Sequence, residues 1–211
     1  MDQPMIFFMM ISILSSFSSA SVVDFCVADL NYPVGPAGFP CKNPATLTSN
    51  DFVFSGFSVA GNTSSSIFKS AITKANHHTF PALNGLGISI SRLDLAVGGI
   101  APLHTHRADE MVLVIEGTII SGFIASDNTA YYKTMNKGDI MILPQSLLHF
   151  QINIGDIPAV LFVSLNSPSP GFQFVPLSLG SNNLPSEIIE KTTLLDPQQV
   201  KKLKNVFRGT N

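Results

Sequence analysis

Two histidines and a carboxylate lie close together near the middle of the 211-residue chain. His104 and His106 are separated by one residue, and Glu110 follows shortly after them. Because side chains alternate between the two faces of a β-strand, the His-x-His spacing places both imidazoles on one face. Two imidazoles and a carboxylate converging in an apolar scaffold are typical metal ligands. The stretch therefore favours a metal site over polar side chains that only contact water at a strand end.

A third histidine belongs to a second segment with its own regular spacing. The first segment follows G-x5-H-x-H-x3-E-x6-G from Gly98 to Gly117. The second follows G-x5-P-x-G-x2-H-x3-N from Gly138 to Asn153, with Ser146 in place of the inner glycine and His149 as its histidine. Both spacings resemble the paired motifs of the cupin superfamily, and their joint match implies that His149 joins the first three ligands.

The elements that must position these residues have the pattern of short β-strands. Apolar runs alternate with turn residues, which is typical of an all-β barrel or sandwich. A change of hydrophobic phase predicts a β-bulge near Ser91 and Arg92. We expect strands at 52–59, 67–75, 85–99, 111–117, 118–125, 130–144 (with a turn at Asn136–Asp139), 149–156, 159–167 and 172–179.

The chain ends in a helical pattern. A short helix is expected from Pro185 to Lys191. Asp196 and Pro197 then supply an N-cap and a first-turn proline for a second helix that stops at Gly209. We expect its apolar face to pack on the barrel or on another subunit.

The N-terminal residues resemble a secretory signal. The run MIFFMMISILSSF has the length of a signal core and is too short to span a bilayer comfortably, and Ser18-Ser19-Ala20 resembles a cleavage site. A buried N-terminal helix is the alternative. We expect a signal peptide at 1–20, a secreted protein and no membrane span.

Charge and cysteine content narrow the class of protein further. The net charge is −2 with 12% charged residues, and no basic patch suggests nucleic-acid binding. In an oxidising compartment, Cys26 and Cys41 are expected to form one disulfide. Asn62 begins an Asn-x-Ser sequon and is a predicted glycosylation site.

The paired metal motifs resemble those of the cupin superfamily. The segments DFCVADL, AGNTS, LNGLGISISRLDLAVGG and KGDIMILPQSLLHFQIN narrow this to plant germin-like proteins, closest to the branch once described as auxin-binding proteins. The resemblance covers essentially the whole chain. It implies a secreted, glycosylated jelly-roll β-barrel of the apoplast or cell wall that forms a dimer or a hexamer of three dimers.

The same resemblance implies one manganese per subunit. Its ligands would be His104, His106, Glu110 and His149. Ligand types alone admit manganese, iron, cobalt, nickel or zinc, so the choice of manganese comes from the family.

The first motif departs from the family in one place. Germin-like proteins usually read His-Thr-His-Pro-Gly-Ala-Ser-Glu, whereas here Arg107 replaces the proline and the loop is one residue shorter. Asp109 is an alternative ligand if the strand begins earlier, but Glu110 keeps the spacing to Gly117. We expect Arg107 to point to solvent, and His77 and His78 to lie on the surface.

Three functions follow from the resemblance. Some germins oxidise oxalate in a pocket lined by two asparagines, and those positions are Ser91 and Ala101 here, which disfavours oxalate oxidase activity. The remaining enzymatic function is superoxide dismutation, with a role in plant defence or the cell wall. The alternative is a non-enzymatic, receptor-like protein that binds a small carboxylic acid such as auxin.

The expected domain organisation combines these elements. A signal peptide at 1–20 precedes a disulfide-pinned arm at 21–50. The cupin β-barrel extends over 51–180, and a C-terminal helical segment at 181–211 is expected to serve oligomerisation.

Overall fold

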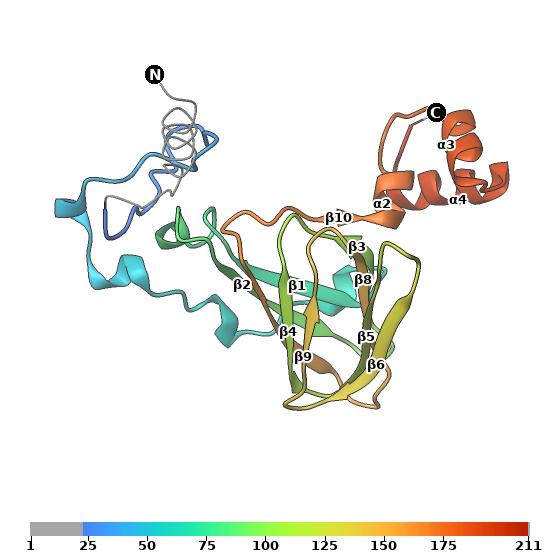
Figure 1. Ribbon diagram of the computed structural model, residues 1–211, viewed down its shortest axis with the longest axis horizontal. Helices are drawn as coiled ribbons and strands as arrows, with labels where there is room; N and C mark the ends of the chain where they lie inside the picture. The colour runs from blue at the N-terminus through green and yellow to red at the C-terminus, as the bar shows by residue number, and fades with distance from the viewer. Residues whose placement is uncertain (1–22, 211) are drawn as a thin grey trace, which may run out of the picture.

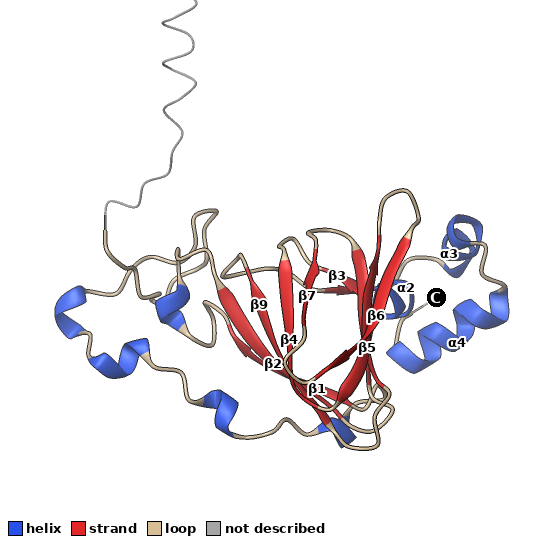
Figure 2. Cartoon of the chain, turned by 60° about the horizontal axis from the view of Figure 1, so that its bottom comes forward, coloured by secondary structure: helices blue, strands red, loops and turns tan. Residues whose placement is uncertain are grey.

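Two five-stranded antiparallel sheets make up the body of the protein, in a computed structural model that describes residues 23–210 (Figures 1 and 2). The strand orders are β1-β2-β9-β4-β7 and β10-β3-β8-β5-β6. The predicted all-β fold is confirmed, while the predicted signal peptide at 1–20 lies outside the described residues. The strands are β1 Ser70–Ala75, β2 Ser89–Leu95, β3 Ile100–Thr105, β4 Glu110–Glu116, β5 Thr118–Ile124, β6 Ala130–Asn136, β7 Ile140–Leu143, β8 Leu148–Asn153, β9 Ala159–Leu165 and β10 Gln173–Phe174.

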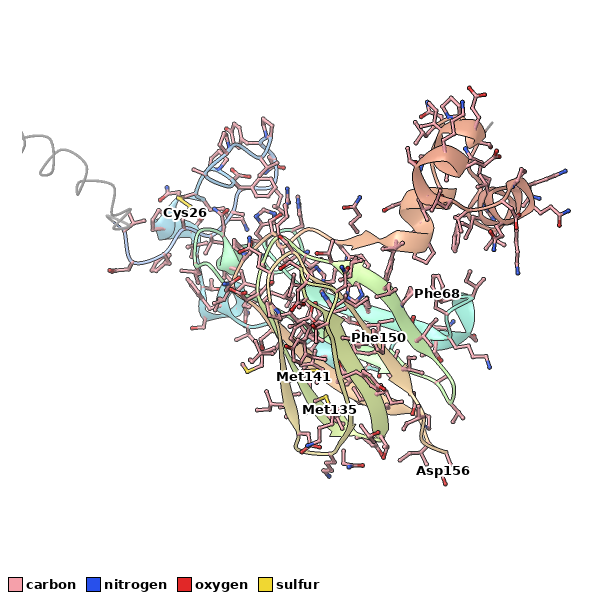
Figure 3. The ribbon with its side chains drawn as sticks, turned by 45° about the vertical axis from the view of Figure 1, so that its right-hand side comes forward. Cys26, Phe68, Met135, Met141, Phe150 and Asp156 are labelled. Carbon is pink, nitrogen blue, oxygen red and sulfur yellow. A yellow bond between two sulfur atoms is a disulfide. The ribbon has the colours of Figure 1, made fainter. Side chains whose placement is uncertain are left out.

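The core lies between the inner faces of the two sheets. β9 shows the alternation clearly, since Ala159, Leu161 and Val163 are buried and the residues between them are less so. Met135 from β6 is also buried, and Met141 from β7 packs against the same cluster (Figure 3). This period-two burial is what closes an apolar interior between two sheets.

β2 is regular, so the predicted bulge near Ser91 and Arg92 is wrong. Residues 89–95 pair with β1 and β9 without any register shift. Ser89, Ser91 and Leu93 lie two residues apart, so their side chains share one face of the strand. All three line a cavity at that end of the barrel, which shows that this is the inner face. The change of phase in the sequence therefore reflects a polar cavity wall.

The segment before β1 forms short 3-10 turns, so the predicted strand at 52–59 is also wrong. Phe54 and Phe57 stack edge to face at 4.9 Å, and Phe57 also packs on Phe162 of β9. In an extended strand, side chains three residues apart point to opposite faces. The two rings can therefore meet only because the chain turns between them. The 3-10 turns are η1 Pro44–Thr46, η2 Ser49–Phe52, η3 Gly56–Ser58, η4 Thr63–Ser65 and η5 Pro81–Leu83.

A disulfide joins Cys26 to Cys41 and closes the N-terminal arm, as predicted (Figure 3). The arm docks on the loop after β1, where Phe39 lies 5.2 Å from the ring of His77. His77 is only 4% exposed, so its predicted surface position is wrong, whereas His78 is exposed. The neighbouring Phe39 ring covers His77, and this long-range contact is not visible in local sequence.

The C-terminal residues form a small helical unit that stands away from the barrel (Figure 1). The strand predicted at 172–179 is limited to Gln173–Phe174, because a helix with Pro176 in its first turn begins at Val175. Both later helices are present, and Asp196 caps the last one through a capping box as predicted. No helix within residues 23–210 is long and apolar enough to cross a membrane. The helices are α2 Val175–Gly180, α3 Ser186–Thr193 and α4 Pro197–Phe207.

Candidate metal centre

The four predicted ligands come from three strands and one loop. His104 in β3 stands directly opposite His149 in β8. His106 follows β3, and Glu110 is the first residue of β4 in the other sheet. The loop between them crosses from one sheet to the other, and it carries the carboxylate over to the three imidazoles.

All four side chains are buried, and one donor atom from each lies within 4.8 Å of the others. Glu110 Oε2 is 3.0 Å from His106 Nε2 and 3.5 Å from His149 Nε2. The structure thus brings together every residue that the two motifs predict as a ligand.

Each imidazole is held through the nitrogen that faces away from this centre. The Nδ1 atoms of His104, His106 and His149 lie 2.8, 2.6 and 2.8 Å from the carbonyl oxygens of Pro102, Gly171 and Leu147. A carbonyl oxygen only accepts hydrogen bonds, so each Nδ1 must donate its proton. In the neutral rings, Nε2 therefore carries a lone pair that points to the centre.

The inward-facing atoms consequently lack partners. Neither Glu110 Oε2 nor His149 Nε2 has a hydrogen-bond partner among the described residues, although Nε2 atoms lie close to the carboxylate. Electron-rich atoms facing each other in a buried space repel unless a cation lies between them. The donor set therefore fits a metal ion.

The ionisation of two ligands agrees with this arrangement. Burial, reinforced by the nearby His149, lowers the pKa of His104 to about 3, so this ring is neutral at physiological pH. Burial raises the pKa of Glu110, but whenever His106 and His149 donate to it through Nε2 in the metal-free protein, these hydrogen bonds outweigh burial and lower the pKa to about 2. A bound cation would take over this role when the Nε2 atoms carry lone pairs. Glu110 is therefore a carboxylate, the form that binds metal.

A cavity of about 220 Å³ opens beside the donors. Its apolar walls include Ile72, Val163 and Phe172, and Lys74 is the one cationic side chain among the described residues that line it. Ser89 Oγ and Gln151 Nε2 are buried without a hydrogen-bond partner in residues 23–210. The space thus combines apolar surface with a few donors that a small polar molecule could satisfy.

The remaining predicted site residues have other roles. Asp109 is exposed and accepts hydrogen bonds from Asn166 and from the backbone of Gln145, so it is not a ligand. Arg107 is exposed as expected. Ser91 and Ala101 both line the cavity, so the residues at these two positions face any molecule bound there.

Asn62, the predicted glycosylation site, lies far from these residues in the chain. Its side chain is exposed and caps a 3-10 turn by accepting a hydrogen bond from Ser64 N. The position leaves the sequon on the protein surface, and glycosylation stays a prediction.

Sequence reasoning missed four residues of the site. Gln151 could have been found, because it follows His149 by two positions on the same strand and therefore shares its inner face. Lys74, Gly171 and Phe172 carry no such signal. They reach the site through a neighbouring strand and through the loop after β9.

One residue of the second motif differs from the motif's usual residue but keeps the backbone conformation expected there. Ser146, which replaces the inner glycine, has a φ of 66° and lies in the left-handed region that favours glycine. Its backbone N–H donates to His106 O at 3.0 Å, which ties this turn to the first motif. The chain thus keeps the glycine-like conformation with a serine.

Comparisons with known proteins agree with this architecture. Residues 55–201 match the cupin family. The chain is 58% identical to the auxin-binding protein ABP19b of Prunus persica, with 98% of each chain covered. It is 54% identical to germin-like protein subfamily 3 member 3 of Arabidopsis thaliana, with 97% of each chain covered.

A solved structure extends the likeness to three dimensions. An oxalate oxidase superimposes with a TM-score of 0.84 at 35% sequence identity, over 88% of this chain and 96% of that chain. The resemblance thus covers the barrel and most of the flanking segments.

Proposed function

The chain belongs to the germin-like proteins of the cupin family, and from this premise we propose that it is a secreted protein whose four buried donors hold one manganese ion per subunit. The observation that carries the proposal is the pair of unpartnered atoms, Glu110 Oε2 and His149 Nε2, at the centre of the donor set. A carboxylate with three imidazoles suits several divalent metals, and family membership favours manganese.

We propose superoxide dismutation as the activity. Manganese held by these residues would supply one-electron exchange with superoxide. The chain's own contribution is access: Lys74 gives the cavity a positive charge that attracts a small anion. The apolar walls limit the water that reaches the donors.

Oxalate oxidation is disfavoured by the composition of the cavity. Ala101 is buried in the cavity wall and has no side-chain donor for a carboxylate, and Ser91 is shorter than the asparagine expected there. Each unmade hydrogen bond of this kind costs roughly 1–3 kcal/mol of binding free energy. The likeness to an oxalate oxidase therefore supports the fold, while the residues at these two positions argue against the same activity.

The alternative function is non-enzymatic binding of a small carboxylic acid such as auxin. The combination of apolar walls with Lys74 favours an anion that has an apolar body. Three relatives are named as auxin-binding proteins. In this case the metal would be structural or would help to hold the carboxylate.

One set of assays separates these functions. Manganese-loaded protein should remove superoxide faster than the same amount of free manganese and should leave oxalate unchanged. His149→Ala should lose the superoxide activity. Equal rates for the protein and free manganese would reject the dismutase, and auxin binding that is unaffected in His149→Ala would reject metal-assisted binding.

The location, modification and assembly of the protein are also part of the proposal. The disulfide between Cys26 and Cys41 and the signal-like residues 1–20 support secretion to the apoplast, the location that the germin-like resemblance implies. We also propose glycosylation at Asn62, a homo-oligomer in which residues 181–211 take part, and a role in defence or in the cell wall.

A further inference from the structure

The loop between β9 and β10 covers the donor set. Residues 167–172, here called the strap, connect the two sheets, and four of them line the cavity: Ser169, Pro170, Gly171 and Phe172. The ring of Phe172 lies 4.9 Å from His104 and 5.1 Å from His106. The strap therefore forms one wall of the route between solvent and the donors.

Three hydrogen bonds tie the strap to the rest of the chain, and each is accepted by one of its carbonyl oxygens. Pro168 O accepts from His77 N at 3.2 Å, and Pro170 O accepts from Arg107 N at 2.7 Å. Gly171 O accepts from His106 Nδ1 at 2.6 Å, which fixes the ring that faces the centre. The strap thus covers His104 and His106 through Phe172 and orients the ring of His106 through Gly171 O.

The bond from Arg107 needs a residue with a backbone N–H directly after His106. Germin-like proteins usually have a proline directly after the second histidine of the motif, and proline has no backbone N–H. Here Arg107 supplies that N–H, next to the ligand His106. A proline at position 107 could not form this hydrogen bond.

The side chain of Arg107 contacts the strap at the same place. Gly171 has a φ of 69°, and a Cβ there would lie 2.9 Å from Arg107 Nε. The guanidinium thus lies against the one strap residue that lacks a side chain, but the hydrogen bond itself uses only the backbone.

We propose that the backbone amide of Arg107 is a positioning group that holds the strap closed over the metal centre. By fixing Pro170, it keeps the Gly171 carbonyl on His106 Nδ1 and the Phe172 ring over the imidazoles. It thereby slows the passage of metal and small molecules between the centre and solvent. This role rests on the proposed metal site, but the closure of the strap is a property of the protein alone.

The first experiment needs no metal. Amide hydrogen exchange is measured on metal-free wild type, Arg107→Pro and Arg107→Ala. Arg107→Pro removes the N–H, whereas Arg107→Ala keeps it and removes only the guanidinium. We expect faster exchange at the His77 amide, which donates to Pro168 O, in Arg107→Pro alone. Equal exchange in the two variants would overturn the proposal.

The second experiment measures manganese release from loaded protein to excess chelator. Arg107→Pro should release metal roughly fivefold faster than wild type, the change expected for loss of one backbone hydrogen bond. Arg107→Ala should match wild type in release rate and in urea midpoint, whereas Arg107→Pro should lower the midpoint by no more than the loss of one hydrogen bond accounts for. Equal release from both variants would contradict the proposed role.

Two outcomes keep this test separate from the proposed function. If wild type binds no manganese, the metal site is rejected, and hydrogen exchange still decides whether Arg107 closes the strap. If Arg107→Pro does not fold, Phe172→Leu replaces it, because this change removes the ring from His104 and leaves the backbone alone. Faster metal release from Phe172→Leu supports the covering role, and release at the wild-type rate overturns it.

Discussion

Burial sets the protonation of His104, which offers a direct test. Its pKa falls from 6.5 to about 3 in the folded protein, chiefly because burial disfavours the charged ring. Between those values the unfolded chain binds a proton that the folded protein does not. Stability is therefore complete above pH 6.5 and is lost as the pH falls towards 3.

We expect the free energy of unfolding of the metal-free protein to fall as the pH is lowered from 6.5 to 4.5. One proton corresponds to about 1.4 kcal/mol per pH unit. Urea unfolding at several pH values measures the slope, and His104→Gln should reduce it. Burial also lowers the pKa of His77, so part of the slope should persist in that variant. An unchanged slope in His104→Gln would show that His104 is not the buried neutral group described above.

Lys74 is the residue that gives the cavity its charge. Its ammonium lies 5.3 Å from the centre of the Phe172 ring, at the entrance covered by the strap. We expect Lys74→Gln to slow superoxide removal, or to weaken carboxylate binding, by about two- to fivefold at low ionic strength. The difference should shrink in high salt, because salt screens exposed charges.

The matched control for this prediction is Lys133→Gln. Lys133 is an exposed lysine of β6 that does not line the cavity. Lys133→Gln removes the same charge from the protein as Lys74→Gln. An equal effect of both substitutions would therefore assign the slower reaction or weaker binding to the change in net charge and not to Lys74.

At the scale of elements, a buried lysine holds the helical unit together. Lys204 in α4 is 4% exposed. Its ammonium donates to Thr210 O at 2.6 Å and to Leu184 O at 2.7 Å. These bonds join the end of the chain and the segment before α3 to α4.

Lys204→Met should therefore destabilise the protein by about 1–3 kcal/mol, since buried carbonyls lose a charged donor. A lower urea midpoint would report the loss. Lys201→Met, on an exposed position of the same helix, should leave the midpoint unchanged. Similar effects of the two substitutions would mean that the buried contacts contribute little.

The elements also show where sequence reasoning succeeds. The ligands could be predicted because β-strand alternation and fixed motif spacing are local properties, as in the His-x-His pair at the end of β3. The strand at 52–59 and the bulge in β2 were wrong because aromatic packing and a polar cavity wall override the local pattern. The strap escapes prediction because backbone carbonyls, such as Gly171 O on His106, have no sequence signature.

For the whole molecule, the outer face of one sheet is a candidate contact between subunits. A shallow apolar groove crosses four of its strands, and Met111 and Ile140 on it are well exposed. Exposed apolar patches of this kind mark association sites. The groove residues are Ile90, Met111, Leu113, Ile140, Phe162 and Ser164.

We expect Ile140→Glu to shift the protein towards smaller species, because it places a charge in this groove. Sedimentation velocity would measure the change. Tyr132→Glu, at an exposed position on β6 of the other sheet, should leave the size distribution as in wild type. An oligomer that survives Ile140→Glu would place the subunit contact elsewhere.

The central claim is that the four donors form one metal site, and metal content measures it most directly. Wild type and Glu110→Gln are loaded with manganese under identical conditions, freed of excess metal and analysed for metal per chain. Glu110→Gln keeps the shape of the side chain but removes the charge. We predict one manganese per wild-type chain, and an affinity at least roughly tenfold weaker in Glu110→Gln. No bound metal in wild type, or equal metal in both proteins, would contradict the account.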